Sequence, residues 1–297
     1  MQRIADFSQV VDAEVEQIAR YLAQVFDAPA ASDRIDETST WSASIPEGTV
    51  HFLNAFRAKY FAYDLHIKIL HEFFRKHGIR RVGDLGCGTA SHLMRLAKLG
   101  YECVGVDESA ESLAMAQEAA GESGVAMEFV HADLRKVSIE PKLDAIISMY
   151  VPLSPASQAD ALRNAKPLLA ERGIFAQVQG QIMKDAPMTD ELYNIDVADL
   201  DRYKVTRFEH WWIENEIISW NAFYLASEYD EGKNYPRSVY AFLDHNDMHF
   251  IRYERAHERK RVVAEIGYQL VSNVPTLGTK SAPPWVQESL EFLQKVK

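Results

Sequence analysis

Three short apolar runs in this chain each end in an acidic residue, and the first also ends in a glycine-rich turn. The acids are Asp84, Asp107 and Asp133, and Gly86 and Gly88 follow the first of them. In an open α/β sheet, ligands bind at the carboxyl ends of the strands, where the strand order reverses. Three carboxylates at that edge would suit a ligand that carries several hydrogen-bond donors and a positive charge.

A nicotinamide dinucleotide is one ligand class to weigh. Its site has the pattern G-x-G-x-x-G after a strand and an acid about 20 residues further on. Gly86, Gly88 and Asp107 fit, but Ser91 stands where the third glycine belongs. Asp84 precedes the first glycine by two residues, where its charge would repel a pyrophosphate. The same carboxylate suits an ammonium group, and S-adenosylmethionine has an ammonium, a sulfonium, a ribose diol and an adenine amino group.

Each residue then has a role toward that cofactor. The two glycines let the backbone approach the ligand where a Cβ would collide. Asp84 can orient the methionyl ammonium, and Asp107 can accept hydrogen bonds from both ribose hydroxyls. Asp133 can accept from the adenine amino group, with the Leu134 backbone N–H available to a ring nitrogen. Simpler roles stay open: Asp107 could cap a helix in competition with Ser109, and Asp133 could cap the turn after its strand.

Alternating strands and helices position these residues. Helical spacing predicts helices over 11–26 and 49–77, separated by a polar loop over 28–48, with Gly78 as a helix stop. From Ile79 onward the pattern alternates, which predicts βαβ units and a mainly parallel sheet. The strands are predicted over 80–84, 101–106, 126–130, 143–148 and 173–178, and the helices over 91–99, 109–120 and 156–169. Ser109 is the predicted cap of the second of these helices, and Gly121 its stop.

After Gly180 the apolar period changes to that of antiparallel strands. One hairpin is predicted from strands over 203–213 and 217–225, and a second from strands over 239–243 and 248–253 that turns at 245–247. A helix over 258–266, Gly267 and a strand over 268–274 follow, whereas the tail from Pro283 fits helix or strand equally well. The fold class expected is a doubly wound, Rossmann-like α/β sheet with N-terminal helices and an antiparallel insertion. The domains expected are a helical cap over 1–78, a cofactor-binding core over 79–180, the insertion over 181–256, and a completion of the core over 257–297.

The segment from about Ile79 to Gln179 resembles the class I S-adenosylmethionine-dependent methyltransferases of the small-molecule type, as does the stretch near 258–274. The family's first motif, acidic-x-Gly-x-Gly-x-Gly, is matched by Asp84 and the two glycines, while Ala90 replaces the third glycine. VGVDES matches the ribose strand and HADL the adenine strand. The resemblance implies that Ser148 to Tyr150, after the fourth strand, lie near the transferred methyl group. The predicted cofactor site is Asp84, Gly86, Cys87, Gly88, Asp107, Glu108, Asp133, Leu134, Ser148 and Met149.

In related small-molecule methyltransferases the N-terminal helices and the insertion build the substrate pocket, and both segments are rich in aromatic residues here. The predicted substrate contacts are Tyr63, Trp211, Trp212 and Tyr224. Alternating aromatics could instead form only the inner face of the hairpin sheet. An oxygen nucleophile normally needs a base, and His210 and Tyr150 are the predicted catalytic residues. His245 and His249 have metal-ligand spacing, but on a hairpin without a cysteine partner they do not predict a metal site.

Composition narrows the partners. The 297 residues carry a formal charge of −11, which argues against nucleic acid, because phosphate binding needs a basic field. No apolar run approaches membrane-spanning length, and the N-terminal residues do not resemble a signal peptide. The only cysteines, Cys87 and Cys103, fall in predicted core elements, which is typical of a reduced, cytoplasmic setting. The expected partner is a small-molecule substrate, and a homodimer stays open.

The expected function is methyl transfer to nitrogen or oxygen of a small molecule. The sequence Ser148-Met149-Tyr150 after the fourth strand differs from the Asn-Pro-Pro-Tyr type that accompanies methylation of nucleobase or glutamine amino groups. Two alternatives keep the cofactor without methyl transfer to a substrate. In one the protein modifies the cofactor itself, and in the other it is a regulatory binding protein.

Overall fold

The computed structural model describes Phe56, Lys59 and residues 63–149, 155–183, 189–200, 203–214, 217–232, 236–249, 251–252, 256–276 and 286–296. The chain divides into two compact units, Met1–Ala43 and Ser44–Lys297, and all described residues belong to the second. The helix predicted over 11–26 and the loop predicted over 28–48 therefore lie outside the described residues.

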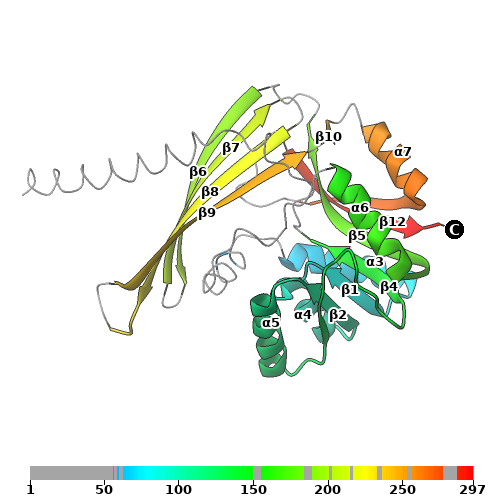
Figure 1. Ribbon diagram of the computed structural model, residues 1–297, viewed down its shortest axis with the longest axis horizontal. Coiled ribbons are helices and arrows are strands. Elements are labelled where there is room, and N and C mark those ends of the chain that lie inside the picture. The colour runs from blue at the N-terminus through cyan, green and yellow to red at the C-terminus, as the bar shows by residue number, and fades with distance from the viewer. Residues whose placement is uncertain are drawn as a thin grey trace, which may run out of the picture. The chain divides into compact units, whose positions relative to one another are not determined.

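One sheet carries the predicted cofactor residues (Figure 1). Its strand order is β11-β12-β5-β4-β1-β2-β3, and the short β10 pairs with β5. The neighbours β3 to β5 pair in parallel, while β12 runs antiparallel to both β5 and β11. The strands are β1 Arg81–Leu85, β2 Glu102–Asp107, β3 Glu128–His131, β4 Leu143–Ser148, β5 Leu169–Ile182, β10 Ile251–Arg252, β11 Tyr268–Pro275 and β12 Val286–Lys295. The predicted doubly wound, mainly parallel fold is confirmed.

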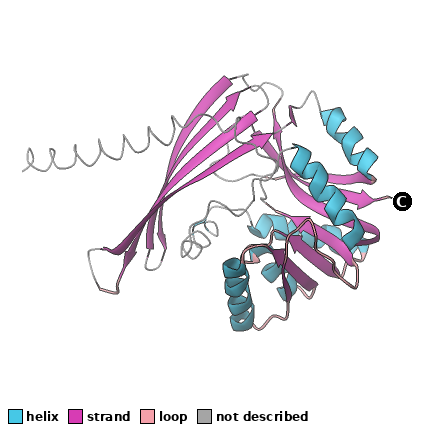
Figure 2. Ribbon diagram, viewed as in Figure 1, coloured by secondary structure: helices cyan, strands magenta, loops and turns pink. Residues whose placement is uncertain are grey.

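Helices cover both faces of this sheet (Figure 2). On one face α3 (Tyr63–His77), α4 (Ser91–Lys98) and α5 (Ala110–Ser123) share an apolar cluster with β1, β4, β5 and β12. On the other face α6 (Pro155–Ala165), the 3₁₀ turn η2 (Lys166–Leu168) and α7 (Ala256–Ile266) share a second cluster with β4, β5 and β12. The strand order reverses between β1 and β4, so the carboxyl ends of these two strands form the crevice in which such sheets bind ligands.

Local signals placed most helix ends correctly. Gly78, Gly100 and Gly267 all have positive φ at helix ends, a conformation that glycine adopts without a Cβ clash. Ser109 caps α5 as predicted, because its Oγ accepts a hydrogen bond from the Ser112 N–H at 3.2 Å. The predicted stop at Gly121 is wrong. The helix continues to Ser123 and ends at Gly124, whose φ of 66° makes the left-handed cap.

The insertion is a four-stranded antiparallel sheet, with β6 (Thr189–Leu200), β7 (Tyr203–Glu214), β8 (Ile217–Tyr229) and β9 (Pro236–His249) in that order. The first predicted hairpin is confirmed as β7 and β8. The second is wrong: β9 is one strand, and residues 245–247, predicted to turn, pair with residues 219–221 of β8. The long ladder with β8 pairs the backbone of β9 along its length, which overrides the local turn preference of His-Asn-Asp. The tail beyond residue 285, left undecided by its pattern, is the strand β12.

Candidate functional site

The turn after β1 is built from three residues with positive φ. Gly86, Gly88 and Ala90 have φ values of 78°, 52° and 59°. The backbone N–H groups of Gly86 and Cys87 both donate to the Val106 carbonyl, at 2.9 and 3.0 Å. These bonds fasten the turn to the end of β2. Ala90 stands where the family's motif has its third glycine. Its left-handed backbone explains why the family prefers glycine at this position.

Asp107 joins the glycine turn to the start of α5. Its Oδ2 accepts the Gly88 N–H at 2.7 Å, and its Oδ1 accepts the Ser109 N–H at 2.8 Å. Each carboxylate oxygen can accept a second hydrogen bond, so the pair remains suited to a ribose diol. The competition left open by the sequence is settled for this stretch: Ser109 caps the helix, and Asp107 organises the turn in front of it.

Asp84 is a buried acid with an unsatisfied oxygen. Its residue is 2% exposed, and its Oδ1 has no hydrogen-bond partner within the described part of the chain. Burial, and then the neighbouring Asp107 charge, raise the pKa of Asp84 well above its usual range. Burial and the same two carboxylates also raise the pKa of the Cys87 thiol, which stays protonated. An isolated buried carboxylate is costly unless a cation or donor meets it, so this position is suited to an ammonium group.

Asp133 has partners of its own. The backbone N–H and Nε of Arg135 both donate to its Oδ1 at 2.9 Å, and an Arg135 terminal nitrogen donates to its Oδ2 at 3.0 Å. These bonds hold the pKa of Asp133 well below its usual range. The carboxylate therefore caps the turn after β3, as the simpler interpretation expected. An adenine amino group would share Asp133 with this arginine, and Leu134 beside it is half-buried.

The ends of β2 and β3 are held together next to these acids. Asp107 pairs in register with His131, and the Ala132 N–H donates to the Asp107 carbonyl at 3.2 Å. The His131 ring nitrogen Nε2 lies 2.9 Å from the Glu108 carbonyl oxygen. The predicted ribose and adenine residues are thus brought to neighbouring strand ends.

Ser148 and Met149 end β4 beside the glycine turn. Both are buried, and Met149 belongs to the same apolar cluster as Cys87 and Ala90. One residue earlier, Ile147 pairs in register with Asp84. The predicted cofactor residues of β1 and β4 are therefore neighbours, whereas Tyr150, the predicted catalytic tyrosine, lies outside the described residues.

Tyr63 lies against the helix that follows the glycine turn. Its ring makes an edge contact with His92, 4.7 Å between centroids, and the Arg95 guanidinium stands 4.6 Å from its centre. His92 in turn stacks on His66 at 5.7 Å. Burial lowers the pKa of His66 to about 4 and, as the largest cause, that of His92 to about 3, so both imidazoles are neutral at pH 7. His92 was not predicted from the sequence, although its place four residues after Gly88 was a usable signal.

The two predicted tryptophans do not share a face of the insertion. Successive side chains on a strand point to opposite faces, so Trp212 lies with His210 and Trp211 lies on the other side. The His210 ring stacks between Tyr193 at 4.3 Å and Trp212 at 4.8 Å, and its Nε2 is 3.7 Å from a Glu191 oxygen. Burial lowers the pKa of His210.

The opposite face of the insertion holds Tyr224 and a buried ion pair. Tyr224 pairs in register with Arg207, and both contact the Phe56 ring, at 5.8 and 4.8 Å between centres. Arg207 also pairs with Asp196 at 2.6 Å and with Glu209 at 3.1 Å. This cluster was not predicted from the sequence. A signal was present, because residues 207 and 209 fall on the same face of the strand as the apolar Val205.

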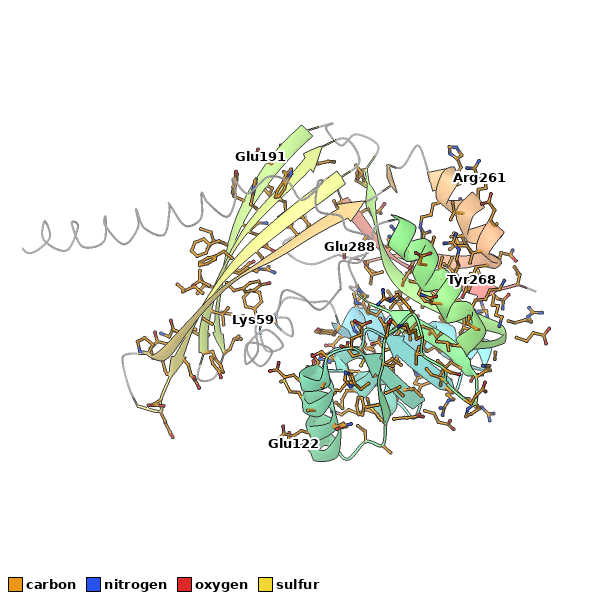
Figure 3. The ribbon with its side chains drawn as sticks, viewed as in Figure 1. Lys59, Glu122, Glu191, Arg261, Tyr268 and Glu288 are labelled. Carbon is orange, nitrogen blue, oxygen red and sulfur yellow. The ribbon has the colours of Figure 1, made fainter. Side chains whose placement is uncertain are left out.

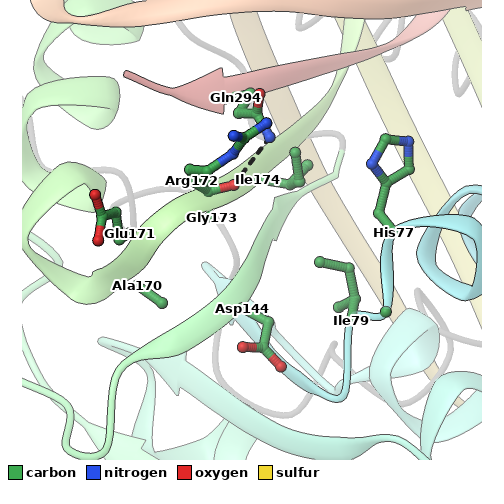
Figure 4. Close-up of a pocket in the computed structure, with 10 residues that line it drawn as sticks. His77, Ile79, Asp144, Ala170, Glu171, Arg172, Gly173, Ile174 and Gln294 are labelled. Carbon is green, nitrogen blue, oxygen red and sulfur yellow. Dashed lines mark hydrogen bonds between the residues drawn. The ribbon is translucent and has the colours of Figure 1, made fainter. Parts of the chain in front are cut away.

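A cavity of about 260 Å³ lies at the other edge of the main sheet (Figure 4). It opens beside the amino ends of β1, β4 and β5, where its lining includes His77, Asp144 and Arg172. Asp144 Oδ2 accepts the backbone N–H groups of Arg80 and Arg81 at 2.9 and 3.0 Å. This carboxylate thus ties β4 to β1, and the cavity is separate from the predicted cofactor residues.

The described residues include no candidate membrane span and no candidate metal site. No helix among them is both long and apolar enough to span a bilayer. Within the same residues, no three His, Cys, Asp or Glu side chains are grouped so that they could hold a metal ion.

Comparison with known sequences matches this site to one family. Residues 82–173 match the family model described as a methyltransferase domain. The chain is 37% identical over 84 residues to a glycine/sarcosine N-methyltransferase of Aphanothece halophytica, which covers 26% of this chain and 32% of that protein. It is 30% identical over 136 residues to a carboxy-S-adenosyl-L-methionine synthase of Campylobacter concisus (strain 13826), which covers 44% of this chain and 57% of that protein. The matches thus span only part of these curated relatives.

Solved structures share the fold over a greater length. The sugar N-methyltransferase KedS8 from Streptoalloteichus sp ATCC 53650 superposes with a TM-score of 0.63 and 20% identity, covering 88% of this chain and 97% of that one. The amino pentose methyltransferase CalS10 from Micromonospora echinaspora superposes with a TM-score of 0.61 and 15% identity, covering 83% and 97%. The segment over residues 82–173, with its acid, its glycine turn and its second-strand aspartate, therefore matches a methyltransferase domain.

Proposed function

We propose that the protein is an S-adenosylmethionine-dependent methyltransferase that methylates nitrogen or oxygen of a small molecule. The observation that carries the proposal is the buried Asp84 carboxylate with its unpartnered Oδ1 behind the glycine turn. The methyltransferase domain match over residues 82–173 and the curated relatives' names support the same activity.

The described residues fit this cofactor. Asp84 would hold the methionyl ammonium. Gly86 and Gly88, whose positive φ values favour glycine, bring no side chain toward the ligand. Asp107 would accept the ribose hydroxyls with its remaining lone pairs, and Met149 would wall the site from the β4 side. When bound, the cofactor supplies an electrophilic methyl group on a positively charged sulfur. The chain's contribution is then mainly to position the reactants and to exclude water.

The insertion and α3 are proposed to contact the substrate. Trp212 and His210 share one face of the insertion, with the imidazole as the proposed base for an oxygen nucleophile, since burial favours its neutral form. Trp211 and Tyr224 lie on the other face of the sheet, so a small substrate at the His210 face would not reach them. Tyr63 would contact the substrate from the helix beside the glycine turn. The names of the sugar and amino pentose methyltransferases that share the fold favour a small polar substrate.

A second candidate is an enzyme that modifies the cofactor itself. One curated relative, 30% identical over 136 residues, is named a carboxy-S-adenosyl-L-methionine synthase. Mass spectrometry of the bound cofactor after incubation separates the candidates. A methyltransferase releases S-adenosylhomocysteine in an amount equal to the methylated product, whereas a cofactor-modifying enzyme leaves a new sulfonium species.

Calorimetry with S-adenosylmethionine and S-adenosylhomocysteine tests the proposal directly. Both ligands should bind the wild-type chain, and Asp84→Asn should weaken binding about 10- to 100-fold, because a charge-assisted hydrogen bond is lost. Asp64→Asn is the matched control, since the Asp64 side chain is fully exposed. If neither ligand binds the wild-type protein, the proposed function is wrong.

A further inference from the structure

The carboxyl edge of the main sheet extends beyond the residues assigned to the cofactor. Adenine, ribose and the methionyl ammonium are proposed to lie at the ends of β3, β2 and β1. The sulfur joins the ribose to the methionyl part, so the reacting methyl lies near β1. The ends of β4, β5 and β12 remain for the substrate. At about 4.8 Å per strand, β12 stands roughly 10 Å from β4 and 14 Å from β1.

Register places Glu288 on the same face of the sheet as Asp84. Asp84 pairs with Ile147, Ile147 with Ala176, and Ala176 with Phe292. Paired residues share a face, and Glu288 lies four residues from Phe292 along β12, so the alternation returns it to that face. Because β12 is antiparallel to β5, the step from Phe292 back to Glu288 leads toward the edge at which the parallel strands have their carboxyl ends. Figure 3 marks Glu288 on its strand.

Glu288 is a partly buried acid, and its Oε2 has no hydrogen-bond partner among the described residues. Its Oε2 is buried and makes no hydrogen bond, and the hydroxyl oxygen of Thr276 has none either. The two residues are neighbours, because the Thr276 N–H donates to the Glu288 carbonyl at 2.9 Å. On the other side Glu288 pairs with Gly180, which has no side chain to fill the space. The row of Thr276, Glu288 and Gly180 therefore holds two unsatisfied polar groups next to a residue without a side chain.

Among the described residues, the strand neighbours of this carboxyl are mostly apolar. Val178 of β5 and Val274 of β11 flank its row, and Arg252 of β10 stands opposite Ile182, one row further on. Helix α3 packs over this face through Phe73 on Phe292, and its buried titratable group is His66. Burial alone raises the pKa of Glu288 to about 7. Such a carboxyl is half ionised near neutral pH, which is the range in which a general base is most effective.

We propose that Glu288, with Thr276 beside it, binds the substrate's protonated amino group and takes its proton before methyl transfer. This inference rests on the proposed function and narrows it to an amine substrate, since an ammonium brings both donors and the charge that a buried carboxylate needs. The ammonium N–H bond breaks and its proton passes to Glu288. The freed nitrogen lone pair forms the N–C bond as the C–S bond breaks. The electron pair of the C–S bond stays on sulfur. The methylated product remains cationic, and Glu288 releases its proton to water.

Binding of a simple ammonium tests the inference without knowledge of the substrate. With S-adenosylhomocysteine bound, cyclohexylammonium should bind the wild-type protein at least about 10-fold more tightly than cyclohexanol, as judged by NMR titration. Glu288→Gln should remove this preference, and Thr276→Val should reduce it several-fold. Glu102→Gln is the matched control, because Glu102 lies at the opposite edge and its side chain is 72% exposed. For any amine that is methylated, Glu288→Gln should lower kcat about 10²- to 10⁴-fold and remove a pH limb near 7.

The outcomes separate the two proposals. Failure of the wild-type protein to bind S-adenosylhomocysteine contradicts the proposed function. Normal binding of S-adenosylhomocysteine with no preference for the ammonium, or with a preference that Glu288→Gln retains, overturns the role of Glu288 alone. If Glu288→Gln does not fold, Thr276→Val decides, and an undiminished preference in that variant overturns the inference.

Discussion

At the residue scale, the informative feature is a carboxylate whose surroundings oppose its charge. Asp84 lies within β1 beside the apolar cluster, and it is 2% exposed. Because both of its sequence neighbours also belong to the strand, the backbone fixes its side chain on the buried face. Sequence reasoning found this residue because its position before the glycines is a local pattern. Burial and the missing partner of Oδ1 are products of packing, which spacing alone does not reveal.

Binding of the cofactor should therefore release a proton from Asp84. In the free protein burial raises the pKa of Asp84, and an ammonium beside it would lower that pKa again. Between the two values binding expels the proton, so affinity rises with pH. Calorimetry in buffers of different ionisation enthalpy should detect this release, and Asp84→Asn should release fewer protons. Equal proton release by the two proteins would exclude Asp84 as the source.

At the element scale, local and long-range signals had different success. The glycine turn, the Ser109 cap and the helix stop at Gly78 were predictable, because each depends on residues within one or two turns of the chain. Strand β9 was mispredicted because its pairing partner β8 outweighs the local turn signal at residues 245–247. Trp211 and Trp212 lie on opposite faces of β7, whereas their adjacency in the sequence suggested that they act together. Arg207 and Glu288 were missed because their burial depends on strands that lie far apart in sequence.

Arg207 should be a structural requirement of the insertion sheet. It pairs with the carboxylates of Asp196 and Glu209, and both Arg207 and Glu209 are buried. Arg207→Met would leave carboxylates in a low-dielectric cluster, which costs about 3–5 kcal/mol of unfolding free energy. Urea denaturation would measure it. Arg261→Met should change stability by less than about 0.5 kcal/mol, because Arg261 makes only an exposed pair with Glu265. Similar losses for the two variants would contradict the assignment.

At the scale of the whole molecule, buried acids should make stability fall as pH rises. For Glu288 the pKa is about 7 in the folded protein against 4.5 in the unfolded chain. Between these values the folded state binds more protons, so the free energy of unfolding decreases with rising pH. The decrease would be roughly 3 kcal/mol for a shift of this size. The free energy of unfolding, measured by denaturation from pH 4.5 to 7.5, should decrease with pH, and Glu288→Gln should reduce this decrease. An unchanged pH dependence in the variant would show that other groups cause it.

Strand β12 has a consequence for how the molecule is made. It lies between β5 and β11, although it follows both in the sequence. During synthesis β5 and β11 therefore keep unpaired backbone edges until residues 286–295 have left the ribosome, and such edges invite association with other chains. The same segment carries Glu288. The glycine turn of a nascent chain can form early. The proposed proton acceptor reaches its place only when β12 inserts between β5 and β11.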